Sequence, residues 1–256
     1  MTSDAFTDPQ DMHGAVRAFP DHLAEGWHRG AAAEDFGLRA EDFDGVVVCG
    51  MGGSAIGGDL VRALAEAESP IPFSVVRGYT LPAWVGPRSL VIASSYSGGT
   101  EETLSAYARA RDAGARIVAI TSGGELARKA AADSLSTVEI PGGLQPRAAL
   151  GYSLGVLLRL GRAMGLVDVT DDAFEATLDA LRAEGDGLAE GSDGNEAVAL
   201  AEAFADRLPV LYCGVGLLEP VSMRWRTQIH ENAKHPAYGN VFPELDHNEI
   251  MGYESG

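Results

Sequence analysis

The chain has 256 residues, of which 46% are hydrophobic and 22% charged, a composition typical of a soluble globular protein with a substantial core. Its net charge of −18, from 19 basic and 37 acidic side chains, disfavours nucleic acid as a partner, because phosphate binding on a surface needs clustered cations. The acidic, lysine-poor composition fits either a salt-rich cytoplasm or a GC-rich genome that prefers Arg and Ala.

Targeting signals are missing from the sequence given. No apolar run approaches the roughly 20 residues that span a bilayer. The acidic start "MTSDAFTDPQD" lacks the basic and apolar regions of a signal peptide. We therefore expect a cytoplasmic protein with no membrane partner, and we expect Cys49 and Cys213 to be buried thiols because each follows a strand-like run.

The first part of the chain has the pattern of alternating strands and helices. Residues 12–33 and 35–42 have helical composition, with breaks near Pro20 and Gly37. Strands are then expected at 46–49, 73–77, 90–94, 117–121 and 136–140, and helices at 55–67, 101–113 and 124–132. Alternation at this spacing predicts an α/β fold in which helices cover both faces of a parallel sheet.

The second part of the chain predicts three helices and the start of another α/β unit. The helices are expected at 147–165, 171–189 and 194–206, with the polar segment "AEGDGLAEGSDGN" connecting the last two. The stretch "VLYCGVGL" that follows is similar to "VVVCGMGG" in the first part, which indicates either two related halves or chance. About forty residues follow Gly216, so either the chain is cut short or the second lobe is abridged. We expect an N-terminal domain at 1–165 and, at 166–256, a helical connection with a partial second domain.

A glycine-rich turn follows the first expected strand, in "CGMGGSAIGGDL" at 49–60. The order of its glycines differs from the dinucleotide fingerprint, and the next strand, "FSVVRGYT", ends without the acidic residue that would bind a ribose. A Walker loop is excluded because no Gly-Lys-Ser/Thr occurs. The turn is therefore either a phosphate-binding loop of another kind or a tight strand-to-helix connection that needs glycine.

A second loop, "ASSYSGGTEETL", follows the third expected strand and contains the hydroxyls of Ser95, Ser97 and Thr100. Gly98 and Gly99 leave backbone N–H groups open, and Thr100 is expected to be the N-cap of the next helix. Hydroxyls, free amides and a helix N-terminus make an anion site without lysine. The alternative is simple capping beside a serine-rich turn. Two such loops at the carboxyl ends of neighbouring strands favour a ligand site, because open α/β sheets bind ligands there.

These segments resemble a known family. "GMGGSAIGGD" and "SYSGGTEETL" resemble the loops of the sugar isomerase (SIS) fold. "LQPRAALGYS", "RWRTQIHENAKHPAYGNVFPELDHNE" and the following "MGY" extend the resemblance to the bifunctional phosphoglucose/phosphomannose isomerase family of archaea and some bacteria, from about residue 44 to the end. The chain departs from the family at Gly99, where Asn is usual. It also has no counterpart of a lysine that family members contribute near their own C-terminus.

The resemblance implies an SIS domain followed by a second SIS-like lobe, in a homodimer that needs no cofactor. It implies interconversion of glucose 6-phosphate, and mannose 6-phosphate, with fructose 6-phosphate through an enediolate. The sugar phosphate would be the small-molecule partner, and its phosphate would be bound by Gly53, Ser54, Ser95, Ser97 and Thr100.

Three catalytic roles follow from the same resemblance. Glu231 matches the base that moves a proton between carbons 1 and 2, His247 the ring-opening histidine and Arg147 the arginine beside the reacting carbons. Taken alone, these residues could equally be a solvated glutamate near Lys234, an exposed histidine and an arginine in a salt bridge. A metal site at His230, Glu231, His235 and His247 is not expected, because their spacing matches no familiar motif.

Other functions stay open at this point. The chain could be a non-catalytic SIS module that binds a phosphosugar, or an inactive truncated chain. It could also be another SIS isomerase or a sugar-phosphate lyase, which the segments "NAK" and "PELDHNE" disfavour.

Overall fold

The computed structural model describes residues 8–189 and 194–254. The chain divides into two compact units, Met1–Leu181 and Arg182–Gly256, and each is described by itself. The boundary falls inside a helix. The expected domain division, at 1–165 and 166–256, stays a prediction.

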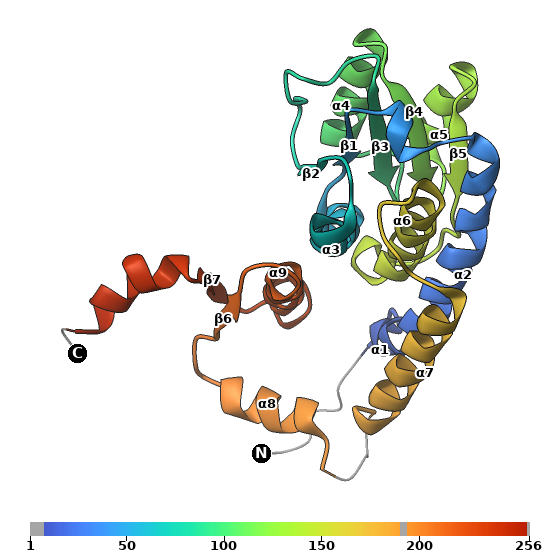
Figure 1. Cartoon of the computed structure of the whole chain (residues 1–256). Helices are drawn as coiled ribbons and strands as arrows, with labels where there is room; N and C mark the ends of the chain where they lie inside the picture. The colour runs from blue at the N-terminus through green and yellow to red at the C-terminus, as the bar shows by residue number, and fades with distance from the viewer. Residues whose placement is uncertain (1–7, 190–193, 255–256) are drawn as a thin grey trace. The chain divides into compact units, whose positions relative to one another are not determined.

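The first unit is built on a five-stranded parallel sheet with strand order β2-β1-β3-β4-β5 (Figure 1). Every residue of the inner strands β1 and β3 is buried, as expected for a sheet covered on both faces. The predicted fold class and the five predicted strands are confirmed, to within a residue or two at each end. The strands are β1 (Gly45–Cys49), β2 (Phe73–Val76), β3 (Ser89–Ser95), β4 (Arg116–Thr121) and β5 (Ser136–Glu139).

Helices follow the strands and cover the two faces of the sheet. Successive side chains of a strand point to opposite faces. Val47 of β1 packs in one cluster with Tyr107 of α4 (Glu101–Asp112) and Leu126 of α5 (Gly124–Ala132). The next residue, Val48, faces α3 (Gly52–Glu68), where a Cβ on Gly58 would lie 3.0 Å from its Cγ1. The helices predicted at 55–67, 101–113 and 124–132 are therefore present, and α3 begins three residues earlier than expected.

Two helices cross closely beside α3. In α6 (Leu150–Met164), a Cβ on Gly155 would lie 2.4 Å from the carbonyl oxygen of Leu23 in α2 (Phe19–Gly30). In α2, a Cβ on Gly26 would lie 2.3 Å from the carbonyl oxygen of Tyr152. The absence of side chains at these glycines lets the two backbones approach each other.

The remaining elements of the first unit surround this crossing. Trp27 of α2 stacks on Phe174 of α7 (Asp171–Gly187) with ring centroids 4.2 Å apart. The break predicted near Pro20 is present at Ala18, and Pro20 occupies the first turn of α2, where its missing N–H is tolerated. The predicted break at Gly37 is present, in left-handed backbone. The short elements are α1 (Met12–Arg17) and the 3-10 turns η1 (Ala31–Phe36), η2 (Ala40–Asp42) and η3 (Pro146–Ala148).

The second unit contains a two-stranded parallel sheet. Strand β6 (Val210–Gly214) pairs with β7 (Tyr238–Phe242), and α9 (Leu218–Gln228) follows β6 after a turn. This strand–turn–helix order agrees with the similarity to the first part of the chain. A second SIS-like lobe nevertheless stays a prediction. The other elements of this unit are α8 (Glu196–Phe204), the π-helical turn η4 (Ile229–Ala233) and the 3-10 turns η5 (Glu244–His247) and η6 (Glu249–Tyr253).

The polar connection expected at 183–195 is partly helical, because α7 continues to Gly187. Residues 190–193 of that connection lie outside the described residues. Asn195 then begins the next helix, and its side chain accepts hydrogen bonds from the N–H groups of Ala197 and Val198. Within the described part of the chain, no helix is both long and apolar enough to cross a membrane.

Candidate functional site

The candidate site lies where the strand order of the first unit reverses. From β1 the chain passes through α3 to β2 on one side, and from β3 it passes through α4 to β4 on the other. The chain therefore leaves β1 and β3 toward opposite sides of the sheet at this point, at the carboxyl ends of the strands, which is where open α/β sheets bind ligands. We call residues 50–53 the β1 loop and residues 96–100 the β3 loop.

Ser54 connects the two loops. It lies in the first turn of α3, and its Oγ accepts a hydrogen bond from the N–H of Tyr96 at 3.3 Å. Only 8% of Ser54 is exposed. The β1 loop also passes close to β3, since a Cβ on Gly50 would lie 3.0 Å from the carbonyl oxygen of Ser94. The two glycine-rich segments that the sequence singled out are therefore in direct contact.

The hydroxyls of the β3 loop and of the strand end before it form a connected set. Ser95 Oγ lies 2.9 Å from Thr100 Oγ1 and accepts a hydrogen bond from the N–H of Gly98 at 3.1 Å. Ser97 is exposed, and its Oγ accepts from the N–H of Gly99 at 3.3 Å. The prediction that Gly98 and Gly99 leave their N–H groups open is therefore wrong, because both donate to these serine hydroxyls. Ser95 is only 1% exposed, so of these hydroxyls Ser97 and Thr100 are the accessible ones.

Thr100 occupies the N-cap position of α4, as predicted, but its side chain does not cap the helix. That part of the prediction is wrong, because the Thr100 hydroxyl hydrogen-bonds to Ser95 instead. Helix α3 also begins without a side-chain cap. The N–H groups in the first turn of a helix have no partner within the helix. Helices α3 and α4 thus both begin at these loops without a side-chain cap, and a helix N-terminus favours a bound anion.

Arg147 lies beside the β1 loop. It belongs to η3, and the carbonyl oxygen of Pro146 in the same turn lies 3.1 Å from where a Cβ on Gly53 would be. Arg147 itself is half-buried. The structure thus gathers, in one region of the first unit, the predicted residues Gly53, Ser54, Ser95, Ser97, Thr100 and Arg147, whose individual roles stay predictions.

The other two predicted catalytic residues lie in the second unit. Glu231 lies in η4, its side chain is exposed, and its carbonyl oxygen accepts a hydrogen bond from Lys234 Nζ at 2.7 Å. Arg224 lies near it: burial lowers the pKa of the Arg224 guanidinium, and the negative charge of Glu231 partly opposes that shift. His247 is exposed at the end of η5. Sequence reasoning missed Arg224, because nothing in the pattern of "RWRTQIHENAK" distinguishes it from the other arginine there, Arg226.

Two further histidines make contacts with the backbone. His230 Nε2 lies 2.9 Å from the carbonyl oxygen and 3.1 Å from the backbone nitrogen of Ala237. His235 Nδ1 lies 2.8 Å from the carbonyl oxygen of Pro236. Over residues 8–189 and 194–254, no three His, Cys, Asp or Glu side chains gather in a way that could hold a metal ion.

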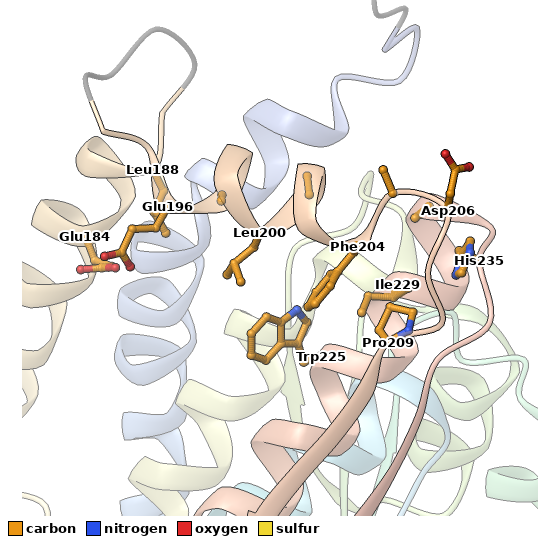
Figure 2. Close-up of a pocket in the computed structure, with 14 residues that line it drawn as sticks. Glu184, Leu188, Glu196, Leu200, Phe204, Asp206, Pro209, Trp225, Ile229 and His235 are labelled. Atoms are coloured by element: carbon orange, nitrogen blue, oxygen red, sulfur yellow. The ribbon is translucent and has the colours of Figure 1, made fainter. Parts of the chain in front are cut away.

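A pocket of about 610 Å³ lies elsewhere, in the second unit. The side chains of Leu200 and Phe204 point toward Trp225 across it (Figure 2). Its described lining includes Glu184, Glu196 and Asp206 but no Lys or Arg. A dianion would be repelled by these carboxylates, so this pocket is a poor anion site, whereas the helix N-termini at the two loops of the first unit favour an anion.

Known proteins that are similar to this chain identify its fold and its family. Residues 193–256 match the family model of the bacterial phospho-glucose isomerase C-terminal SIS domain. The chain is similar to the C-terminal domain of glucosamine-fructose-6-phosphate aminotransferase from Francisella tularensis, with a TM-score of 0.71, 16% identity, and coverage of 96% of this chain and 74% of that one. This likeness shows the fold alone, and the class of protein is that of SIS-fold proteins.

Curated relatives identify the family. The chain is 46% identical to a bifunctional phosphoglucose/phosphomannose isomerase from Caldicellulosiruptor bescii, over 95% of this chain and 72% of that protein. It is 36% identical to the protein of the same name from Aquifex aeolicus, over 91% of this chain and 69% of that protein. The chain belongs to the bifunctional phosphoglucose/phosphomannose isomerase family and is a sugar-phosphate isomerase. The predicted family is thereby confirmed.

Proposed function

We propose that this isomerase interconverts glucose 6-phosphate, and mannose 6-phosphate, with fructose 6-phosphate through an enediolate. The observation that supports it best is the pair of helix N-termini without side-chain caps, surrounded by hydroxyls, at the switch point of the sheet. Arg147 lies beside them. The names of the relatives supply the particular sugars.

The hydroxyls can donate hydrogen bonds to a phosphate. Ser54 Oγ accepts from Tyr96, so its own hydrogen is left for a phosphate oxygen. If the buried Ser95 donates to Thr100, the Thr100 hydroxyl is likewise free to donate. Ser97 is exposed and keeps its hydrogen as well. In this proposal Ser54, Ser97, Thr100 and the backbone N–H of Gly53 bind the phosphate, while Ser95 orients Thr100.

The reaction consists of proton transfers, which need no redox cofactor. His247 moves a proton between the ring oxygen and the hydroxyl on carbon 1 as the cyclic sugar opens. Glu231 removes the proton from carbon 2 of the aldose and returns it to carbon 1, with a proton exchanged between the two oxygens. Arg147 stabilises the negative charge of the enediolate. The proposal requires the carboxylate and the imidazole to reach a sugar held at the loops.

Glu231→Gln tests this assignment, because the amide keeps the size of the side chain and removes its basicity. Turnover should fall by at least the roughly 10²–10⁴-fold that general acid–base catalysis contributes, with KM little changed. The wild type should also exchange the hydrogen on carbon 2 with solvent deuterium, and the variant should not. Both readouts are available from NMR of the sugar phosphates, which also identifies the product.

Glu219→Gln is the matched control, since Glu219 is an exposed glutamate in the first turn of α9. It should leave turnover unchanged. A loss of less than about tenfold in Glu231→Gln would place the base elsewhere. A wild-type chain that binds glucose 6-phosphate without converting it would favour the alternative, a non-catalytic module that binds a phosphosugar.

A further inference from the structure

Tyr96 has no role in the mechanism above, yet it lies at the centre of the site. It directly follows Ser95, the last residue of β3, and it is half-buried. Its N–H donates to Ser54 Oγ at 3.3 Å. Its carbonyl oxygen accepts from Ser122 beyond β4, from the N–H at 3.2 Å and from Oγ at 2.6 Å. These backbone contacts join the loops that follow β1, β3 and β4.

The side chain of Tyr96 reaches a fourth segment. Its phenol oxygen accepts a hydrogen bond from the N–H of Leu144 at 2.9 Å. Leu144 comes three residues before Arg147, and the chain between them is stiff: Pro146 restricts the backbone, and the N–H of Ala148 closes a turn on the carbonyl oxygen of Gln145 at 2.8 Å. The position of Leu144 therefore largely determines the backbone position of Arg147.

The chain on the other side of Leu144 offers little support of its own. Gly142 and Gly143 precede it, and Gly143 has a φ of 98°, with open space around the position of its missing Cβ. Glycine loses more conformational freedom on ordering than any other residue. The hydrogen bond from Leu144 to Tyr96 comes immediately after these two glycines, so it restrains the chain before Arg147 at the point where the backbone is least restrained otherwise.

We propose that Tyr96 is a positioning residue for the isomerisation: its phenol oxygen holds Leu144 and thereby fixes Arg147 beside the loops that bind the phosphate. This inference rests on the proposed function. Tyr96 acts through Arg147 and does not touch the sugar. The same residue contacts the phosphate loops through its backbone and the segment before Arg147 through its side chain, so it sets the spacing between those loops and Arg147.

Tyr96→Phe removes the phenol oxygen and leaves the ring and every backbone contact in place. The kcat should fall by about tenfold or more, because misplacing a catalytic group by roughly 1 Å can cost about 10²-fold. The KM should stay within about twofold, since uniform binding of the phosphate is untouched. Tyr107→Phe is the control: it removes a phenol that bonds to Asp133, away from the loops, and should leave kcat unchanged.

A double-mutant cycle tests whether Tyr96 acts through Arg147. In an Arg147→Ala parent, Tyr96→Phe should lower kcat by less than about twofold, because the group that it positions is gone. If Tyr96→Phe cost the same factor in both parents, the phenol would act on its own and the inference would be overturned. An unchanged kcat in the single variant would overturn it as well.

Hydrogen exchange gives a readout that does not depend on activity. The Leu144 amide should exchange at least about tenfold faster in Tyr96→Phe, while amides of β3 keep their protection. Unchanged exchange at Leu144 would overturn the role of Tyr96 even in an active enzyme. A wild type without isomerase activity would instead overturn the proposed function, and with it the effect of Tyr96 on catalysis. Faster exchange of the Leu144 amide in Tyr96→Phe would still support the structural part of the inference, that Tyr96 restrains the segment before Arg147. The two failures are thus distinguishable.

Discussion

Gly98 and Gly99 are adjacent in the β3 loop, but only one of them needs to be glycine. Gly98 has a φ of 67°, and a Cβ there would lie 1.8 Å from the carbonyl oxygen of Gly123. Gly99 has only Ser97 Oγ near, at 4.0 Å. Gly98 therefore lets the β3 loop pack against the loop after β4. The N–H of Leu126, in the first turn of α5, donates to the carbonyl oxygen of Gly98 at 2.8 Å. The departure of the chain from its family at Gly99 falls on the position with room for a side chain.

Gly98→Ala should destabilise the protein by about 2–5 kcal/mol, because left-handed backbone costs alanine roughly 1–2 kcal/mol and overpacking roughly 1–3 kcal/mol more. Gly99→Ala is the matched control and should change the free energy of unfolding by less than about 0.5 kcal/mol. Urea unfolding measures both. Equal stability of the two variants would show that the β3 loop can move away from Gly123 at no cost.

The site residues show how far sequence reasoning reaches at this scale. Hydroxyls at the end of a strand could be predicted as a group, because their residue types and spacing are visible in the sequence. Which hydroxyl is accessible to solvent could not be predicted, because Ser95 and Ser97 have the same chemistry. Packing alone buries Ser95, which is 1% exposed, and leaves Ser97 exposed. The contact from Tyr96 to Leu144 spans 48 residues, and no local pattern indicates it.

At the scale of elements, the crossing of α2 and α6 depends on glycine at the contact. Four glycines contribute to it, and in each case an added Cβ would meet the opposite helix. Helix propensity would favour alanine at every one of these positions. The backbone contact must therefore stabilise the structure by more than glycine costs. These positions are Gly26, Gly30, Gly151 and Gly155.

Gly155→Ala should lower the free energy of unfolding by at least about 1 kcal/mol, because its Cβ would meet backbone atoms of Leu23 and Trp27 that cannot rotate away. Gly185→Ala in α7 should instead stabilise the protein by about 0.5–1 kcal/mol, since nothing lies within 4 Å of that position. The changes in the free energy of unfolding should therefore have opposite signs, which distinguishes the effect of packing from the effect of helix propensity. Urea denaturation followed by circular dichroism measures both, and a stabilising Gly155→Ala would refute the close approach.

For the molecule as a whole, the large negative net charge destabilises the folded state relative to the unfolded chain. The chain carries a charge of −18, and like charges repel one another more when the chain is folded. Ion pairs such as Arg162 with Asp171, at 2.6 Å, offset part of this repulsion, and that pairing lowers the pKa of the Asp171 carboxyl. Since only 19 of the charged side chains are basic, we expect repulsion to dominate.

Salt should therefore stabilise the protein. Raising KCl from about 0.05 to 1 M shortens the Debye length to about 3 Å and screens the repulsion, so Tm should rise by several degrees at pH 7. Near the isoelectric point of about 4.6 the rise should disappear. Differential scanning calorimetry at both pH values measures this. A Tm that falls with added KCl at pH 7 would mean that the ion pairs outweigh the repulsion.

The overall architecture was predictable to different degrees in the two units. The alternation of strands and helices was sufficient to predict the parallel sheet of the first unit, since strands buried on both faces have continuous apolar sequences. The order β2-β1-β3-β4-β5 was not predictable, because strand pairing depends on packing between distant segments. The strands of the second unit carry exposed apolar side chains, those of Val210, Tyr212 and Phe242. Their apolar sequences therefore do not correspond to burial as those of β1 and β3 do. The homodimer expected of this family stays a prediction.

The different burial of the two cysteines gives the native sequence a single site for chemical labelling. Cys49 lies within β1, is 1% exposed, and burial raises the pKa of its thiol to about 12. Its thiolate, the form that reacts, is therefore scarce at neutral pH. Cys213 lies half-buried on β6. A maleimide spin label should attach there alone, without any engineered substitution. In a homodimer, the dipolar coupling between two such labels would report how far apart the second units of the two copies lie.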